Sequence, residues 1–236
     1  MKRTARAPVI KKVMRRTRAI VVAAKAPRAG AVKTRLCPPL SPEEAARLAR
    51  AFLDDTLEAA APLRKVADLF LALDEDAAKV PAAARRLRQR GGHLGERLVH
   101  LFADVFAEGY EQVCVVGSDA PHLPAAFLVE AFGRLAQNDV ALGPADDGGY
   151  YLVALRAPAP ELFGGDIGWG GPGVLADTLA RAAEAGRTAG LLPPWYDIDT
   201  PHDLRRLQRD LRRGAAFAPA TAALLQERPV REDLLP

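Results

Sequence analysis

A short loop after the first apolar run carries a cluster of basic side chains that could bind phosphate. Residues 25–35 follow the apolar stretch 18–24 and contain no acidic residue. The basic members of this loop are Lys25, Arg28, Lys33 and Arg35. Gly30 lets the backbone turn tightly and approach a ligand, while arginine and lysine neutralise phosphate oxygens. The loop therefore predicts a di- or triphosphate site, although it lacks both common glycine-rich phosphate motifs. A solvated basic loop is the alternative.

Three aspartates near the ends of other extended runs could hold a metal ion. Asp119 follows an apolar run in "VVGSDAPHL". Asp197 and Asp199 occupy alternate positions in "YDIDTPHDL", so an extended backbone would point both to one side. Mg²⁺ is typically held by one or two carboxylates plus substrate phosphates. We expect Asp119 to bind Mg²⁺ or Mn²⁺ together with Asp197 or Asp199. A turn or helix-capping role is the alternative for Asp119.

A pair of adjacent carboxylates, Asp146 and Asp147, lies in "LGPADDGGYYLVAL". Two like charges are costly to bring together unless a cation or a cationic substrate is near. One of the two is therefore a candidate to act as a base or to orient an acceptor hydroxyl. Asp-Gly is also a strong signal for a tight hairpin turn, so a plain turn remains open.

Alternating strands and helices are needed to bring these loops together. Strands are expected at residues 18–24, 66–73, 111–117, 139–145 and 150–156, with a short strand or loop at 196–199. Helices are expected at residues 41–60, near 76–90, at about 95–108, and at 124–136, 171–186 and 200–213. This alternation predicts an α/β fold with three layers, α/β/α, around a mostly parallel sheet. In such sheets the ligand lies at the carboxyl ends of the strands, where the candidate residues cluster.

Two expected helices carry capping signals at their first residues. Ser41 precedes Pro42 and is followed by Glu44, which is the pattern of a capping box. Thr200 and Asp203 repeat the pattern at the start of the last expected helix. Because Thr200 satisfies that cap, the two aspartates before it remain available for a ligand.

Composition excludes several classes of protein. The net charge of +4 depends on five cations in the acid-free residues 1–13, and without them it would be −1. We therefore expect residues 1–17 to be a disordered basic tail, residues 18–236 to be one domain, and no nucleic-acid partner. No apolar run approaches the roughly 18 residues of a membrane span. Cys37 and Cys114 match no metal or redox spacing, and a cytoplasmic location is expected.

The motifs, taken in order, resemble one family. They are K-x-P-x-x-G-x-V-K-T-R-L, L-G-E-R-L, G-S-D-x-P, D-D-G-G-Y-Y and D-I-D-T-x-x-D-L. This series is similar, from about residue 18 to 213, to a family of GT-A-fold transferases (DUF2064-like) described as glycosyltransferases linked to arsenosugar biosynthesis. Residues 32–59 also resemble the opening of 2-phospholactate guanylyltransferase, a GT-A-fold nucleotidyltransferase.

The resemblance implies a nucleotide-diphospho-sugar transferase fold, a nucleotide-activated donor, a small-molecule acceptor and a divalent metal. It implies phosphate contacts for Lys25, Lys33 and Arg35, and base or ribose contacts for Gly95 and Glu96. It implies Asp119 as the metal ligand, with Asp199 as its partner and Asp197 nearby. It implies an acceptor side formed by Asp146, Asp147, Gly148, Gly149, Tyr150 and Tyr151. The sequence departs from many relatives at Gly92-His93, where a Gly-Asp-type pair is common.

Two reactions fit these expectations. Aromatic side chains suit a sugar or apolar acceptor, so Tyr150 and Tyr151 favour glycosyl transfer, and Trp169 could stack on the same acceptor or simply plug the sheet edge. The alternative is nucleotidyl transfer to a phosphorylated acceptor, with pyrophosphate released. Lys33 and Arg35 suit that reaction, although nucleotidyltransferase relatives carry a Gly-Gly-Thr-Asn-type loop. A silent nucleotide-binding protein is less favoured, because the carboxylates and cations are all present.

Overall fold

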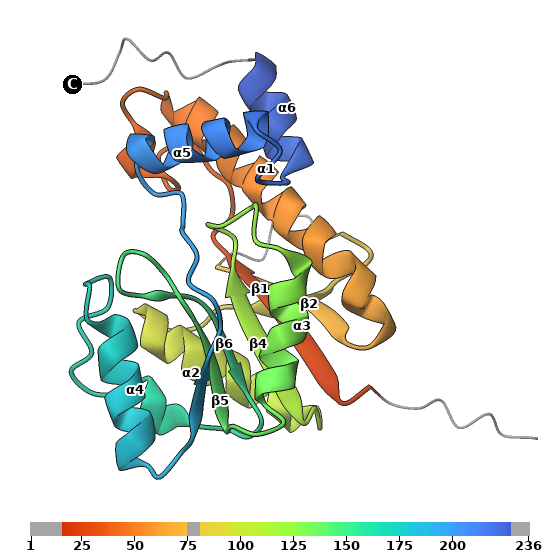
Figure 1. Cartoon of the computed structure of the whole chain (residues 1–236), viewed down its shortest axis with the longest axis vertical. Coiled ribbons are helices and arrows are strands. Elements are labelled where there is room, and N and C mark those ends of the chain that lie inside the picture. Colours follow the sequence, from red (N-terminus) through yellow and green to blue (C-terminus); the bar gives the residue numbers. More distant parts are fainter. Residues whose placement is uncertain (1–15, 75–80, 228–236) are drawn as a thin grey trace, which may run out of the picture.

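A single β-sheet forms the centre of the computed structural model, which describes residues 16–74 and 81–227. Within these residues the strand order is β3-β2-β1-β4-β6-β5-β7 (Figure 1). The strands are β1 (Arg18–Ala24), β2 (Asp68–Leu73), β3 (Arg85–Arg88), β4 (Gln112–Gly117), β5 (Val140–Pro144), β6 (Tyr150–Leu155) and β7 (Ala189–Leu191). Neighbouring strands are parallel except at β6, which is antiparallel to both β4 and β5. The predicted mostly parallel sheet is confirmed.

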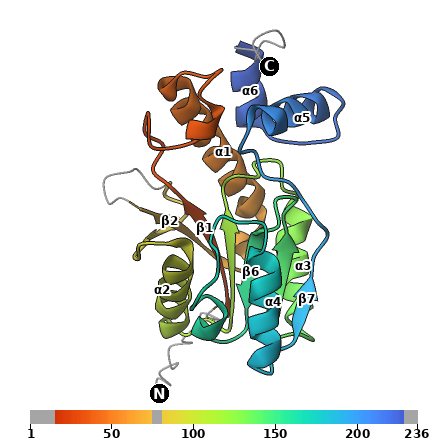
Figure 2. The same ribbon diagram turned by 90° about the vertical axis from the view of Figure 1, so that its left-hand side faces the viewer.

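Helices cover both faces of this sheet. In the described residues they are α1 (Pro42–Ala60), α2 (Leu94–Ala107), α3 (Ala125–Arg134), α4 (Val174–Glu184), α5 (Pro201–Arg212) and α6 (Pro219–Glu227). Ile20 and Val22 of β1 pack in one apolar cluster with side chains of α1 and α3. Ala19 and Val21 point to the other face and share a second cluster with α2 and α4. The expected three layers are therefore present (Figure 2).

A third apolar cluster lies beyond the carboxyl edge of the sheet, among α1, α5 and α6 (Figure 1). Tyr196 and Ile198, from the segment that leads into α5, are buried in this cluster. The burial anchors the backbone on both sides of Asp197. It therefore determines where Asp197 and Asp199 can lie.

Local capping explains where α1 and α5 begin. The Ser41 hydroxyl accepts a hydrogen bond from the Glu44 N–H, and the Glu44 carboxylate accepts one from the Ser41 N–H. Thr200 and Asp203 make the same reciprocal pair at α5. Both predicted capping boxes are confirmed, and Thr200 leaves the preceding aspartates uncommitted to the helix.

One predicted element is wrong in its second half. The helix expected near residues 76–90 contains the strand β3, and residues 75–80 lie outside the described residues. β3 pairs with the free edge of β2, in the register Phe70 with Arg85. This pairing with a distant segment outweighs the local preference of an arginine-rich run for helix. β7 and α6 were not predicted. None of the helices within the described residues combines the length and apolarity needed to cross a membrane.

Candidate active site

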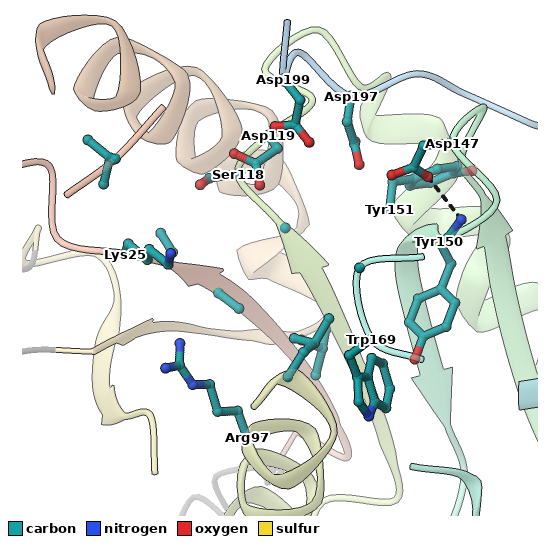
Figure 3. A pocket seen from close by; sticks show the side chains of 18 of the residues that line it. Lys25, Arg97, Ser118, Asp119, Asp147, Tyr150, Tyr151, Trp169, Asp197 and Asp199 are labelled. Carbon is teal, nitrogen blue, oxygen red and sulfur yellow. Dashed lines mark hydrogen bonds between the residues drawn. The ribbon is translucent and has the colours of Figure 1, made fainter. Parts of the chain in front are cut away.

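A cleft of about 460 Å³ opens at the carboxyl ends of the parallel strands. It is lined by the loop after β1, the start of α2, the end of β4 and the segment before α5 (Figure 3). Because β6 runs against its neighbours, its first residues reach the same edge as the last residues of β1 and β4. Loops that are far apart in the sequence therefore meet in one cleft.

Three carboxylates, those of Asp119, Asp197 and Asp199, lie together at one end of the cleft (Figure 3). The ammonium of Lys33 lies 2.5 Å from Asp119 Oδ1 and 2.9 Å from Asp199 Oδ1, and it donates to the Ile198 carbonyl at 2.7 Å. The backbone joins the same segments, since the Ile198 N–H donates to the Asp119 carbonyl at 2.9 Å. The end of β4 and the segment before α5 are thus locked together.

The charges of this cluster depend on one another. Burial, together with the nearby carboxylates of Asp119 and Asp199, raises the pKa of Asp197 to about 7. Burial alone would lower the pKa of Lys33, but the same two carboxylates outweigh it and hold that pKa above its ordinary value. Lys33 is therefore charged, and it balances part of the negative charge around it.

The donor set offers a divalent cation two carboxylates, and water or substrate phosphates would have to complete its coordination. Within the described ranges, no group of three or more histidine, cysteine, aspartate or glutamate side chains is arranged to hold a metal ion. Asp119 and Asp199 nevertheless already converge on a single cation, the Lys33 ammonium. Mg²⁺ is commonly held by one or two carboxylates plus substrate phosphates. These residues fit a hydrated metal ion to which a nucleotide adds phosphate oxygens, and their role as ligands stays a prediction.

The basic loop after β1 divides into residues with different surroundings. Lys25 and Arg35 are exposed and line the cleft, so both are placed to meet a phosphate. Lys33 also lines it but bonds to carboxylates instead of projecting into open space. Gly30 does not line the cleft; its φ of +75° is in the left-handed region, so it shapes the turn.

Gly95 and Glu96 do not contribute to the lining of the cleft. A side chain on Gly95 would meet the Phe163 carbonyl and come within 2.6 Å of the Trp169 ring, so this glycine permits close packing. The Glu96 carboxylate accepts a hydrogen bond from the Gly92 N–H at 2.7 Å, outside the cleft. The residues through which α2 lines the cleft are Leu94, Arg97 and Leu98.

Gln89 is a cleft residue that the sequence analysis missed. Its side-chain amide donates to the Ala24 carbonyl at 2.8 Å and to the Ala72 carbonyl at 2.9 Å, which joins the ends of β1 and β2. No sequence signal identifies Gln89 as a cleft residue, because its position depends on β3, where the sequence predicts helix. The sequence could have identified Arg97 as a cleft residue. It follows Leu94 by three positions, so the two lie on the same face of α2, and both line the cleft.

The adjacent aspartates are separated by the turn that carries them. Asp146 forms an ion pair with Arg206 of α5 at 2.7 Å and does not line the cleft. Asp147 lines the cleft, and its Oδ1 accepts a hydrogen bond from the Gly149 N–H at 2.9 Å. Gly148, with φ of +86°, packs against the loop before α4. The predicted repulsion is thus relieved, and only Asp147 is placed to touch a substrate.

The aromatic side chains form a wall of the cleft. Tyr151 is 4% exposed and its hydroxyl donates to the Pro193 carbonyl at 2.9 Å. The hydroxyl of Tyr150 is buried as well. The Trp169 ring is stacked against His93 with 6.3 Å between the centroids, beside the start of α2. These aromatic side chains are held by the protein, which weakens the case that the two tyrosines stack on a sugar.

The sequence is similar to a known family and to two named enzymes. Residues 45–171 match the family described as uncharacterized proteins conserved in bacteria (DUF2064). Phosphoenolpyruvate guanylyltransferase of Sphaerobacter thermophilus is 31% identical over 193 residues, which is 76% of this chain and 88% of that protein. 2-Phospho-L-lactate guanylyltransferase of Methanothermobacter thermautotrophicus is 28% identical over 179 residues, 73% of this chain and 76% of that protein.

The fold is that of the nucleotide-diphospho-sugar transferases. A crystal structure of a protein from Desulfovibrio desulfuricans G20, named as a transferase of this kind, superimposes with a TM-score of 0.81. The two chains are 34% identical, and the match covers 90% of this chain and 95% of the other. The sheet described above therefore belongs to an architecture that the two proteins share.

Proposed function

Because the chain belongs to the DUF2064 family and aligns with two guanylyltransferases over about three quarters of its length, we propose that it is a nucleotidyltransferase. The chain is an enzyme of the transferase class, and the proposal concerns its reaction. A nucleoside triphosphate, GTP by analogy with the names of those relatives, reacts with the phosphate of a small phosphorylated acid. The products are a nucleoside diphosphate joined to that acid, and pyrophosphate.

One observation carries the proposal. The exposed cations Lys25 and Arg35 line the same cleft as the carboxylates of Asp119 and Asp199. A triphosphate needs cations along its whole length, which lysine and arginine supply directly. Carboxylates beside a triphosphate are useful only if they bring a metal ion. The combination therefore suits a metal–triphosphate complex better than an uncharged ligand.

The reaction requires little proton transfer from the protein. An oxygen of the acceptor phosphate attacks the α-phosphorus, the bond to the bridging oxygen of the β-phosphate breaks, and pyrophosphate leaves. A phosphate monoester has a second pKa near 6 and is already ionised at neutral pH, so no general base is required and Asp147 would orient the acceptor through a cation bound to both. Lys25 and Arg35 would hold the triphosphate, and Asp119 and Asp199 would hold Mg²⁺ or Mn²⁺. The ion, when bound, stabilises negative charge on the phosphates.

Glycosyl transfer, which the two tyrosines favour in the sequence, has less support than this alternative. The ring of Tyr151 is buried and its hydroxyl is committed to a backbone carbonyl. The two curated relatives are both guanylyltransferases by name. The chain has Tyr150-Tyr151 after Gly148-Gly149, where the family resemblance implies a Gly-Gly-Thr-Asn-type loop in nucleotidyltransferases, so a different acceptor is expected there.

A product assay distinguishes the two reactions. The purified protein is incubated with each nucleoside triphosphate, Mg²⁺ and a panel of phosphorylated hydroxy acids that includes 2-phospholactate and phosphoenolpyruvate, and pyrophosphate is measured. We expect pyrophosphate to form only when both substrates are present. Release of a nucleoside diphosphate from a nucleotide sugar, without pyrophosphate in any triphosphate reaction, would show instead that the chain is a glycosyltransferase.

A further inference from the structure

Lys33 has no hydrogen left for a nucleotide. An ammonium carries three donors, and those of Lys33 face three oxygens: Asp119 Oδ1 at 2.5 Å, Asp199 Oδ1 at 2.9 Å and the Ile198 carbonyl at 2.7 Å. The Lys33 side chain is only 7% exposed although the cleft is open beside it. Three oxygen atoms therefore surround the ammonium in the way that ligands surround a metal ion.

The backbone is shaped to place Lys33 there. Its φ of 48° and ψ of 38° lie in the left-handed region, which is unfavourable for a residue with a side chain. Among the described residues it is the only non-glycine with a positive φ. The ammonium also makes a cation–π contact, 5.5 Å from the centre of the Phe52 ring in α1. An unfavourable conformation at a candidate site is retained only where the surrounding contacts compensate for it.

The position of Lys33 conflicts with the role proposed for the carboxylates around it. The ammonium occupies the point on which Asp119 Oδ1 and Asp199 Oδ1 converge, and a divalent cation held by both of these oxygens would take the same place. A cation bound instead through the other oxygen of each carboxylate would lie close to the ammonium and be repelled by it. The two cations therefore compete for the carboxylate pair.

We propose that Lys33 is a resident counter-ion that a divalent cation replaces, so that metal binding frees the ammonium to bind the nucleotide. The inference rests on the proposed function and adds the order in which the metal and the nucleotide bind. Without metal, Lys33 keeps Asp119 and Asp199 together and prevents their repulsion. Once displaced, it lies in the cleft that Lys25 and Arg35 also line, where a triphosphate is the anion it meets. Metal and nucleotide then assist each other, because each favours the same displaced state.

Binding of Mn²⁺ to the protein without nucleotide tests the exchange. Mn²⁺ affinity is measured by electron paramagnetic resonance and calorimetry for the wild type, Lys33→Met and the matched control Lys25→Met. Removal of a competing cation should tighten Mn²⁺ binding of Lys33→Met by about tenfold or more. The Lys25 variant, which loses an exposed cation, should change by less than about threefold. Unchanged or weaker Mn²⁺ binding by a folded Lys33→Met protein would show that Lys33 only holds the carboxylates in place.

A second measurement uses the unaltered protein, in case Lys33→Met does not fold. Surface lysines are acetylated briefly and quantified by mass spectrometry, with Lys65, which is exposed and does not line the cleft, as the internal reference. We expect Lys33 to be protected without metal and several-fold more reactive with saturating Mn²⁺, then protected again when GTP is added. Equal protection with and without Mn²⁺ would overturn the exchange.

The two proposals can fail separately. Pyrophosphate formation by a chain whose Lys33 stays protected in saturating Mn²⁺ would overturn the exchange and leave the proposed function standing. Exchange of Lys33 for Mn²⁺ in a chain that forms no pyrophosphate would support the exchange and overturn the proposed reaction. Absence of Mn²⁺ binding both with and without GTP would overturn the exchange and the metal site together.

Discussion

At the scale of single residues, neighbours in the sequence have different surroundings. Asp146 turns out toward Arg206, whereas Asp147 faces the cleft and is held by the Gly149 N–H. Asp197 is half-buried near the carboxylates of Asp119 and Asp199, and its partial burial together with these charges raises its pKa to about 7. A residue type alone therefore does not assign a role, and the contacts of each side chain must be read separately.

The pair Asp146 and Asp147 offers a matched test. Asp147→Asn should lower kcat/KM for pyrophosphate formation by about 10- to 100-fold, because an amide orients an acceptor and its bound cation less well than a carboxylate. Asp146→Asn should lower it by less than about fivefold, since an exposed ion pair contributes little. Steady-state kinetics of both variants check this. Similar losses in the two variants would mean that the turn, and not the cleft-facing carboxylate, matters.

Metal dependence can be tested at Asp119. The variant Asp119→Asn keeps the shape of the side chain and removes a charge that contacts Lys33. We expect its nucleotide affinity to lose most of its dependence on Mg²⁺ and its pyrophosphate formation to fall by about 100-fold or more. Calorimetric titration of GTP with and without Mg²⁺ measures the effect. Wild-type metal dependence in Asp119→Asn would reduce Asp119 to a turn residue.

At the scale of elements, buried polar contacts and close packing keep the helices around the cleft. The carboxylate of Asp55 in α1 is buried and accepts hydrogen bonds from the N–H groups of Ala220 and Thr221 and from the Thr221 hydroxyl. These donors lie in the first turn of α6, where a carboxylate is favoured. α6 in turn completes the cluster in which Tyr196 and Ile198 are buried. The site therefore depends on a helix that does not touch it.

Replacement of Asp55 should loosen α6. Asp55→Ala leaves buried donors without an acceptor, and we expect it to lower the free energy of unfolding by about 2–4 kcal/mol. Asp54→Ala is the control on the same helix; it breaks an exposed pair with Arg50 and should cost less than about 1 kcal/mol. Denaturant unfolding measures both. Equal, small effects would contradict the assigned role of Asp55.

Two helical glycines should respond in opposite directions to alanine. Gly95→Ala would push its methyl group into the Trp169 ring and the Phe163 carbonyl, so it should destabilise by about 1–3 kcal/mol and weaken nucleotide binding. A methyl group on Gly133 in α3 would meet nothing within 4 Å, so Gly133→Ala should stabilise by up to about 1 kcal/mol. Thermal and denaturant unfolding give both values. Stabilisation by Gly95→Ala would show that Trp169 can move away freely.

At the scale of the whole molecule, an aromatic cluster connects the sheet, the cleft and α5. His122 follows the end of β4, and its ring packs against Tyr196 at a tilt of 51° with 4.3 Å between the centroids, while Arg206 of α5 lies 3.6 Å from the centre of the Tyr196 ring. The Tyr196 hydroxyl donates to Asp210 of α5 at 2.5 Å. His122 is 3% exposed, and burial lowers its pKa to about 4.

This histidine makes the stability of the molecule depend on pH. Its ordinary pKa is 6.5, so as the pH falls the unfolded chain takes up the proton before the folded chain does. The free energy of unfolding should therefore decrease from about pH 6.5 to about pH 4, by up to about 3 kcal/mol from this group. His122→Phe should remove that part of the slope. Denaturant unfolding between pH 8 and pH 4.5 checks it, and identical slopes in variant and wild type would contradict the assignment.

Local patterns in the sequence were sufficient for much of the fold. Ser41 and Thr200 cap their helices as predicted because a capping box is complete within four residues. The apolar run before Asp119 forms a central strand because its apolar side chains are buried whichever strands pair with it. In such sheets the ligand lies at the carboxyl ends of the strands, so the aspartates and the basic loop were expected at one edge. The cleft at this edge includes Asp119, Asp197 and Asp199 together.

Contacts between distant segments decided the rest. β3 forms because β2 offers an unpaired edge, and that pairing carries Gln89 into the cleft. Asp146 and Asp147 separate because Arg206, 60 residues away along the chain, takes one of them. Lys33 turns from the expected phosphate to the carboxylates because two negative charges outweigh the cost of removing its ammonium from water. Each of these outcomes depends on free energies between segments that only the folded chain brings together, which is why no local pattern in the sequence contains them.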